Sequence, residues 1–222
     1  MISSREIEIK IPKVSIAEYA IGYSWLNELV GAYSKYPVEL RSFYNTSKTM
    51  NYRSKWWIYW LGQKKRSSNG NTPLHDAVGS EDLSRFLSLC CNTEVKNNVG
   101  ATPLHDAAWK GDLEAARLLV EAGANLSAIN RSGATALHDA AWCGHTNIVK
   151  LLVDAGAPLE IKNTNFGRTP LGDAAYSYMG RADTVEFLLE KGAKKDVRNF
   201  LGKTPLQEAT IMKRHDKIAL LK

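Results

Sequence analysis

The residues of this chain that could do chemistry stand at matching places in five similar phrases. Three of the phrases place a histidine next to an aspartate, a pair that can serve acid–base catalysis or bind a metal. Because His75, His105 and His138 recur together with the phrase around them, we interpret them as structural residues. The phrases are Thr72-Pro73-Leu74-His75, Thr102-Pro103-Leu104-His105, Thr135-Ala136-Leu137-His138, Thr169-Pro170-Leu171-Gly172 and Thr204-Pro205-Leu206-Gln207.

The other reactive groups form no catalytic pattern. The three cysteines, Cys90, Cys91 and Cys143, have no zinc-site spacing, and their odd number argues against a disulfide framework. No base stands near Cys143 in the sequence, and no glycine-rich phosphate loop occurs. The sequence therefore predicts a protein that is not an enzyme and that uses no cofactor or metal. The cysteine usage and the lack of a long apolar run predict an intracellular chain, cytoplasmic or nuclear.

An acidic residue follows the last residue of every phrase, and a second column of residues stands three places further on. The second column holds two tryptophans and a tyrosine, and three-residue spacing puts both columns on one helical face. Because stacked helices lie about 8–10 Å apart, we expect a ladder of carboxylates interleaved with rings. The acids are Asp76, Asp106, Asp139, Asp173 and Glu208, and the second column is Gly79, Trp109, Trp142, Tyr176 and Ile211.

Short helices in a repeating pair must position these residues. The phrase threonines are separated by 30, 33, 34 and 35 residues, a period typical of stacked helical units. In the second unit, Thr102 caps a helix that begins at Pro103 and ends at a turn around Gly111. A second helix over 112–122 carries apolar residues at three- and four-residue spacing, and Gly123 ends it.

These features resemble the ankyrin-repeat family across residues 69–222, through Thr-Pro-Leu-His-x-Ala-Ala, the helix-ending Gly-Ala and the period near 33 residues. The resemblance implies an all-α solenoid of five helix-turn-helix repeats, whose motif histidines bridge backbone groups of neighbouring loops. It also implies that the acidic and aromatic columns face a concave groove that binds a partner protein. The residues expected to meet the partner are Asp76, Asp106, Trp109, Lys110, Asp139, Trp142, Cys143, Asp173, Tyr176, Tyr178 and Glu208.

Two units depart from the pattern. The first is three residues short and lacks the helix-ending Gly-Ala, as terminal repeats often do. The fourth has about two extra residues in the turn over 176–180, and we expect this turn to display Tyr178 and Met179.

The chemistry of the expected groove favours a basic ligand. A carboxylate beside an indole ring suits a lysine or arginine, because the ring face adds about 0.5–2 kcal/mol to the ion pair. We therefore expect a Lys/Arg-rich segment of another protein, anchored at Trp109 and Trp142, and the resemblance extends this to basic tails such as histone tails. An alternative explanation of the acidic column is that a first-turn carboxylate complements the helix dipole, by about 0.3–1 kcal/mol.

Residues 1–66 differ in composition from residues 67–222. They carry 11 Lys or Arg against 5 Glu and hold 12 of the 20 aromatic residues, whereas the remainder is neutral, with 18 basic against 18 acidic residues. The polar run over 64–70 predicts a linker, and hence two regions that meet near residue 66. Alternating apolar residues predict a strand over 6–11, and helical spacing predicts one helix over 15–36 and another from Pro37.

Three roles stay open for this N-terminal region. As an aromatic-rich helical cap, it could cover the exposed side of the first repeat. It could instead contact a membrane or nucleic acid through a basic-aromatic patch. In the third role the protein is an adaptor or effector whose N-terminal region carries the activity while the repeats select the target; this basic region could also occupy the groove in cis. The patch comprises Trp56, Trp57, Lys64, Lys65 and Arg66.

Overall fold

The computed structural model describes residues 66–80, 83–84, 87 and 92–222. The strand expected over 6–11, the helices expected over 15–36 and from Pro37, and the tryptophan cluster at 56–60 lie outside these residues. Within the described part the regular structure is entirely helical, as the all-α prediction requires.

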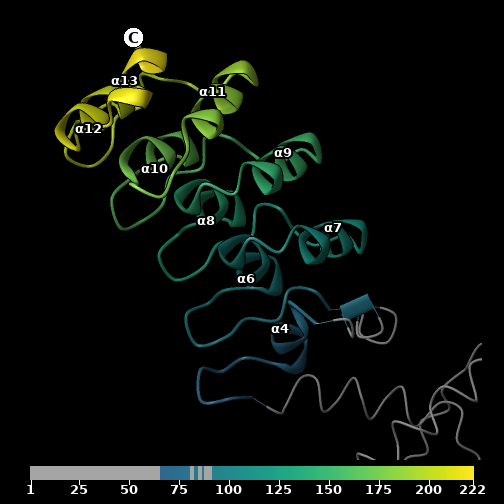
Figure 1. Cartoon of the computed structure of the whole chain (residues 1–222). Coiled ribbons are helices and arrows are strands. Elements are labelled where there is room, and N and C mark those ends of the chain that lie inside the picture. Colours follow the sequence, from purple (N-terminus) through teal and green to yellow (C-terminus); the bar gives the residue numbers. More distant parts are fainter. Residues whose placement is uncertain (1–65, 81–82, 85–86, 88–91) are drawn as a thin grey trace, which may run out of the picture. The chain divides into compact units, whose positions relative to one another are not determined.

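The helices form two columns (Figure 1). The helix that follows each threonine belongs to the first column, and in the second to fifth units the second helix packs beside it. We number the units from first to fifth by Thr72, Thr102, Thr135, Thr169 and Thr204. The first column comprises α4 (Pro73–Ala77), α6 (Pro103–Lys110), α8 (Ala136–Cys143), α10 (Pro170–Tyr176) and α12 (Pro205–Ile211), and the second comprises α7 (Leu113–Glu121), α9 (Thr146–Asp154), α11 (Ala182–Glu190) and α13 (His215–Leu221).

Each first-column helix begins at a threonine in extended conformation. Thr102, at φ −88° and ψ 166°, precedes Pro103, whose missing N–H is harmless in the first turn of α6. The backbone N–H of Thr102 donates to Nδ1 of His105 at 3.2 Å. Since Nδ1 accepts this bond, Nε2 carries the ring proton and donates to the carbonyl oxygen of Ala134 at 3.0 Å.

The motif histidines therefore tie each unit to the next one. His75 bonds in the same way to the carbonyl oxygen of Ala101 at 2.9 Å, and His138 to that of Arg168 at 3.1 Å. Burial lowers the pKa of both His105 and His138 to about 4, so both rings are neutral near pH 7. The bridging role expected of these histidines is thus confirmed.

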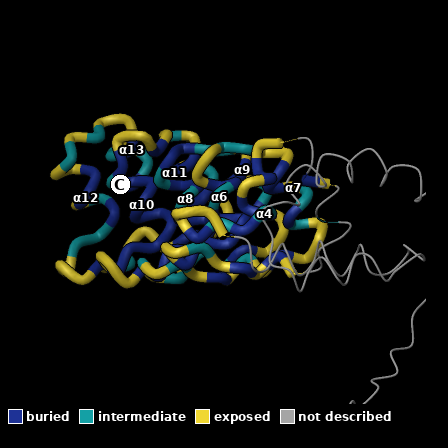
Figure 2. The backbone as a smooth tube through the Cα atoms, turned by 90° about the horizontal axis from the view of Figure 1, so that it is seen from below, coloured by how far each residue is buried: buried dark blue, intermediate teal, exposed yellow. Residues whose placement is uncertain are grey.

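Small side chains let the first-column helices approach closely. Alanine pairs in α6, α8 and α10 are fully buried, and so are leucines of the second-column helices, such as Leu119, Leu152 and Leu188. The buried positions run through the middle of the stack, and exposed positions gather at the hairpin tips and outer turns (Figure 2). The alanines are Ala107, Ala108, Ala140, Ala141, Ala174 and Ala175.

The turns between the two helices of a unit are of two kinds. After α8, Gly144 adopts φ 73°, and a Cβ there would lie 2.3 Å from the carbonyl oxygen of Met179. After α10 the chain instead continues through Ser177 in extended conformation, and the longer turn leaves Tyr178 74% exposed and Met179 43% exposed. The fourth unit thus presents an aromatic ring at a place where the second and third units have only a tight glycine turn.

Candidate partner-binding surface

The five acids and three rings singled out in the sequence lie on the first-column helices, and we call them the stripe. The acids become more buried along the chain: Asp76 is exposed, Asp106 and Asp139 are half-buried, and Asp173 and Glu208 are buried. The stripe comprises Asp76, Asp106, Asp139, Asp173 and Glu208 with Trp109, Trp142 and Tyr176.

The carboxylates of the stripe are close enough to affect one another electrostatically. Burial raises the pKa of Asp139 to about 8, and the charges of Asp173 and Asp106 on either side act in the same direction. Burial likewise raises the pKa of Asp173 to about 7, with a further contribution from Glu208, against the lowering effects of Arg168 and Asn163. The acids therefore form one continuous row along the stack.

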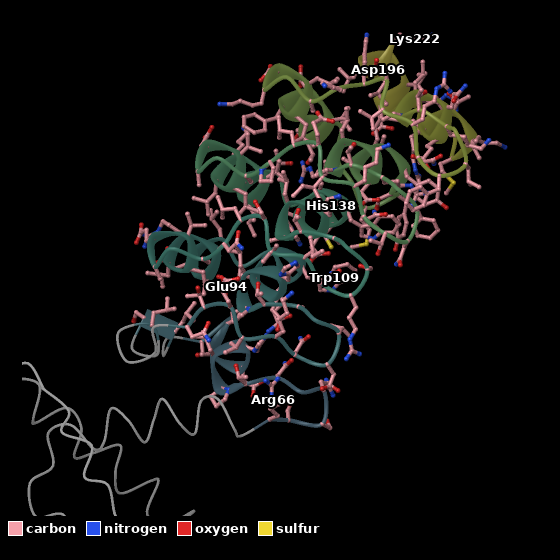
Figure 3. The ribbon with its side chains drawn as sticks, turned by 180° about the vertical axis from the view of Figure 1, so that it is seen from behind. Arg66, Glu94, Trp109, His138, Asp196 and Lys222 are labelled. Atoms are coloured by element: carbon pink, nitrogen blue, oxygen red, sulfur yellow. The ribbon has the colours of Figure 1, made fainter. Side chains whose placement is uncertain are left out.

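The rings of the stripe accompany this row. Trp142 and Tyr176 are stacked, with ring centroids 5.9 Å apart and planes inclined by 28°. Trp109 is 56% exposed and lies on the side of α6 toward the hairpin loops (Figure 3). One indole is therefore largely open to solvent, three residues from the half-buried Asp106 on the same helix.

At the fourth unit, a cation of the chain itself occupies the stripe. Arg168 donates from Nε to Oε1 of Glu208 at 2.7 Å, and its Nη1 lies 3.9 Å from Oδ1 of Asp173. Its guanidinium carbon lies 3.7 Å from the ring centroid of Tyr176 and 4.5 Å from that of Phe166. The side chains of Arg168, Asp173 and Glu208 are only 5%, 7% and 4% exposed, so little of this part of the stripe is left for a partner.

Amide groups complete the hydrogen bonding of these two buried acids. Asn163 donates to Oδ2 of Asp173 at 3.0 Å, and Asn199 donates to Oε1 of Glu208 at 2.7 Å. Such bonds offset the cost of burying carboxylates. In contrast, among the described residues neither Asp106 nor Asp139 has an ion pair or a side-chain hydrogen bond.

Sequence reasoning missed Arg168, although a signal for it exists. Arg168 stands directly before Thr169, and the residues before the other phrase threonines are Asn71, Ala101, Ala134 and Lys203. This column points at the acids, because Asn71 donates to Oδ1 of Asp76 at 3.3 Å just as Arg168 approaches Asp173, in each case five residues on. The residue before the phrase threonine is thus a second position from which the chain contacts its own acids, and in the fourth unit it supplies a cation.

A cavity of about 400 Å³ adjoins the stripe beside α6. Side chains from the first two hairpins and the carboxylate of Asp106 line it. Because amides dominate the lining, the cavity can hydrogen-bond to a polar ligand but supplies no cation of its own. Its lining residues are Ser68, Asn69, Asn71, Asn97, Asn98, Val99 and Asp106.

Four other predicted contact residues differ in how much surface they offer. Tyr178 is exposed, and the guanidinium carbon of Arg214 lies 5.8 Å from its ring centroid. Lys110 is exposed and donates to the carbonyl oxygen of Val78 at 3.3 Å. Cys143 is buried beneath the stripe, and burial raises the pKa of its thiol to about 11. Arg66, expected in the basic-aromatic patch, donates to the carbonyl oxygens of Gly70 and Lys96.

Comparison with protein families identifies the architecture. A family model described as ankyrin repeats (3 copies) matches residues 54–130, 79–163 and 126–199, which together cover well over half of the chain. The chain therefore belongs to the ankyrin-repeat family, as its sequence motifs indicated. No curated protein matches it closely enough to be reported.

Membership of this family defines a general role. Ankyrin repeats are protein–protein interaction modules and are typically not catalytic. Across the residues that the structure describes, no helix is long and apolar enough to cross a membrane. In the same part of the chain, no three His, Cys, Asp or Glu side chains gather as a metal site would require.

Proposed function

We propose that this protein binds a partner protein through the stripe, and that the partner contributes a segment rich in lysine or arginine. The proposal rests on Asp106 and Asp139, two half-buried carboxylates without a partner among the described residues, next to the indole of Trp109. A cationic side chain placed there would favour the ionised form of both acids, whose pKa values burial raises, and it would gain a ring face.

Arg168 supports the proposal from within the chain. It combines ion pairs to two acids of the stripe with contacts to two rings, which is the set of interactions expected of a bound basic residue. The remaining predicted contacts, including Asp76, Lys110 and Tyr178, would border the same ligand. Cys143, Asp173 and Glu208 would contribute through the shape of the floor, because they are buried.

A titration of the full chain with labelled peptides tests the proposal. We expect an Arg/Lys-rich peptide to bind, a matched peptide with glutamine at every basic position not to bind, and the affinity to fall as salt rises from low to physiological concentration. The double variant Asp106→Asn/Asp139→Asn should weaken binding by about tenfold or more, because neither amide can ionise beside a bound cation.

A second double variant serves as the control. Glu186→Gln/Glu190→Gln removes the same charge from exposed positions of α11 in the second column, so it should leave the affinity nearly unchanged. Equal losses in the two double variants would mean that overall charge attracts the peptide and that the stripe is not the site.

A further inference from the structure

We infer that one arginine side chain of the partner binds to the stripe at the second unit. It would occupy the place, beside Ala101, that corresponds to the one that the side chain of Arg168 occupies in the fourth unit. The inference rests on the proposed function and specifies its ligand as a guanidinium group lying between Asp106 and Asp139 on the ring of Trp109.

The two places share two backbone hydrogen bonds, although the hairpin before Arg168 is one residue longer than the one before Ala101. The carbonyl oxygen of Arg168 accepts from Nε2 of His138, and its N–H donates to Oδ1 of Asn163. In the second unit the carbonyl oxygen of Ala101 accepts from Nε2 of His75, and its N–H donates to Oδ1 of Asn97 at 3.0 Å. Residues 101 and 168 are therefore held by corresponding hydrogen bonds, from a histidine of the preceding unit and to an asparagine of the same hairpin.

The side chains that surround the two places also correspond. Five residues after Arg168 comes Asp173, eight residues after it comes Tyr176, and the acid of the next unit is Glu208. The same counts from Ala101 give Asp106, Trp109 and, in the next unit, Asp139. The second unit thus has both acids and the ring but only a methyl group in place of the guanidinium.

The third unit has the same alanine but a less open place. Ala134 donates its N–H to Oδ1 of Asn130 at 3.1 Å, so it is held by a corresponding hydrogen bond. However, the acid beyond it is Asp173, which Arg168 and Asn163 already contact, and its ring, Trp142, is stacked on Tyr176. These contacts favour the second unit, where Trp109 is exposed and the cavity reaches Asp106.

Lys110, which follows Trp109 in α6, does not fill the place. Burial raises the pKa of Asp106, and the charge of Lys110 opposes this rise only in part. The ammonium of Lys110 donates to the carbonyl oxygen of Val78, and it forms no ion pair with Asp106 among the described residues. An arginine is preferred over a lysine because its planar guanidinium can stack on an indole while it bonds to two carboxylates, as Arg168 does with Tyr176.

Two peptides of alternating basic and glycine residues, one with arginine and one with lysine, test the inference on the full chain. We expect the arginine peptide to bind about three- to tenfold more tightly, the range that the ring contact supplies. The variant Trp109→Ala should weaken the binding of both peptides, but that of the arginine peptide more, so that most of this difference disappears.

A substitution that fills the place from within gives an independent test. Ala101→Arg should reproduce the arrangement of Arg168 and lower the affinity for the arginine peptide at least tenfold, whereas Ala101→Met, of similar bulk but without charge, should lower it much less. Thermal melting of both variants establishes that they fold. If Ala101→Arg does not fold, the variant Asp106→Asn replaces it. This variant removes one carboxyl group at nearly the same size and should abolish the preference for arginine.

The outcomes separate the two proposals. Equal binding of the arginine and lysine peptides, or unchanged binding by folded Ala101→Arg, overturns the arginine site while the basic-segment function stands. Failure of both peptides to bind at low salt overturns the function and the arginine site together.

Discussion

The side chain of Lys217, in the last helix, donates from Nζ to the carbonyl oxygen of Ala174 at 2.8 Å, although 43 residues separate the two in the chain. It also donates to the carbonyl oxygen of Ser177, and only 1% of the residue is exposed. Because α10 ends in an extended serine, these carbonyls have no following turn of helix to bond them. The lysine of the fifth unit therefore completes the end of α10.

We predict that Lys217→Met destabilises the protein by about 2–4 kcal/mol, because it leaves two buried carbonyl oxygens without a donor. Urea unfolding followed by circular dichroism measures the change. Lys194→Met, at an exposed position after α11, is the control and should stay within about 0.5 kcal/mol of the wild type. Equal stability of the two variants would show that water satisfies these carbonyls instead.

We predict that Arg168→Met destabilises the protein by about 3–5 kcal/mol, because Asp173 and Glu208 would remain buried without a cation. Arg117→Met is a matched control: Arg117 also pairs with two acids, but on the exposed face of α7, and its loss should change stability by less than about 1 kcal/mol. Adding Glu208→Gln to Arg168→Met should recover part of the loss in a double-mutant cycle. Strictly additive effects would contradict the pairing.

The buried histidines predict a dependence of stability on pH. Burial lowers the pKa of His138 to about 4 from its ordinary 6.5. Between these two pH values the imidazole is protonated in the unfolded chain but neutral in the folded one, so acid favours unfolding. The contribution of this histidine to stability is complete above pH 6.5 and is lost as the pH falls toward 4.

The variant His138→Gln isolates this effect. Glutamine does not titrate, and Gln207 shows that it can accept the capping bond, since its Oε1 accepts from the N–H of Thr204 at 3.0 Å. We expect the gap in unfolding free energy between the wild type and the variant to shrink by about 2 kcal/mol from pH 7 to pH 4.5. Parallel curves over this range would contradict the assignment.

Two glycines with similar backbone angles should differ in their tolerance of alanine. Gly123, at φ 81°, has open space where a Cβ would stand, whereas a Cβ on Gly144, at φ 73°, would meet the carbonyl oxygen of Met179. We predict that Gly123→Ala costs about 1 kcal/mol through backbone strain alone and that Gly144→Ala costs about 1–3 kcal/mol more through the clash. Equal values in thermal melts would mean that the turn after α8 shifts freely.

The helices of the fold could be predicted because their signals are local. Thr102 and Pro103 start a helix by satisfying the first turn, and Gly123 stops one by accepting a positive φ, whatever the rest of the chain does. The register of Asp106 and Trp109 on one face followed from the same local geometry. These features needed no knowledge of distant residues.

The internal pairing of the stripe could not be predicted because it depends on contacts between distant residues. Arg168 reaches Glu208 across 40 residues, and Lys217 reaches Ala174 across 43, so neither partner could be read from its own helix. Lys217 in particular would be expected at the surface, since lysine is rarely buried without compensating bonds. The prediction therefore located the acids but not which of them the chain neutralises for itself.

The internal pairing of Arg168 also gives the row of acids a direction. A peptide laid across α6, α8 and α10 would meet acids without a cationic partner at the α6 end. At the α10 end it would meet acids that Arg168 already pairs with and that lie beside the ring of Tyr176. Reversing the order of residues in such a peptide would move its basic end away from Asp106, so this molecule would distinguish the two orientations of an otherwise identical composition.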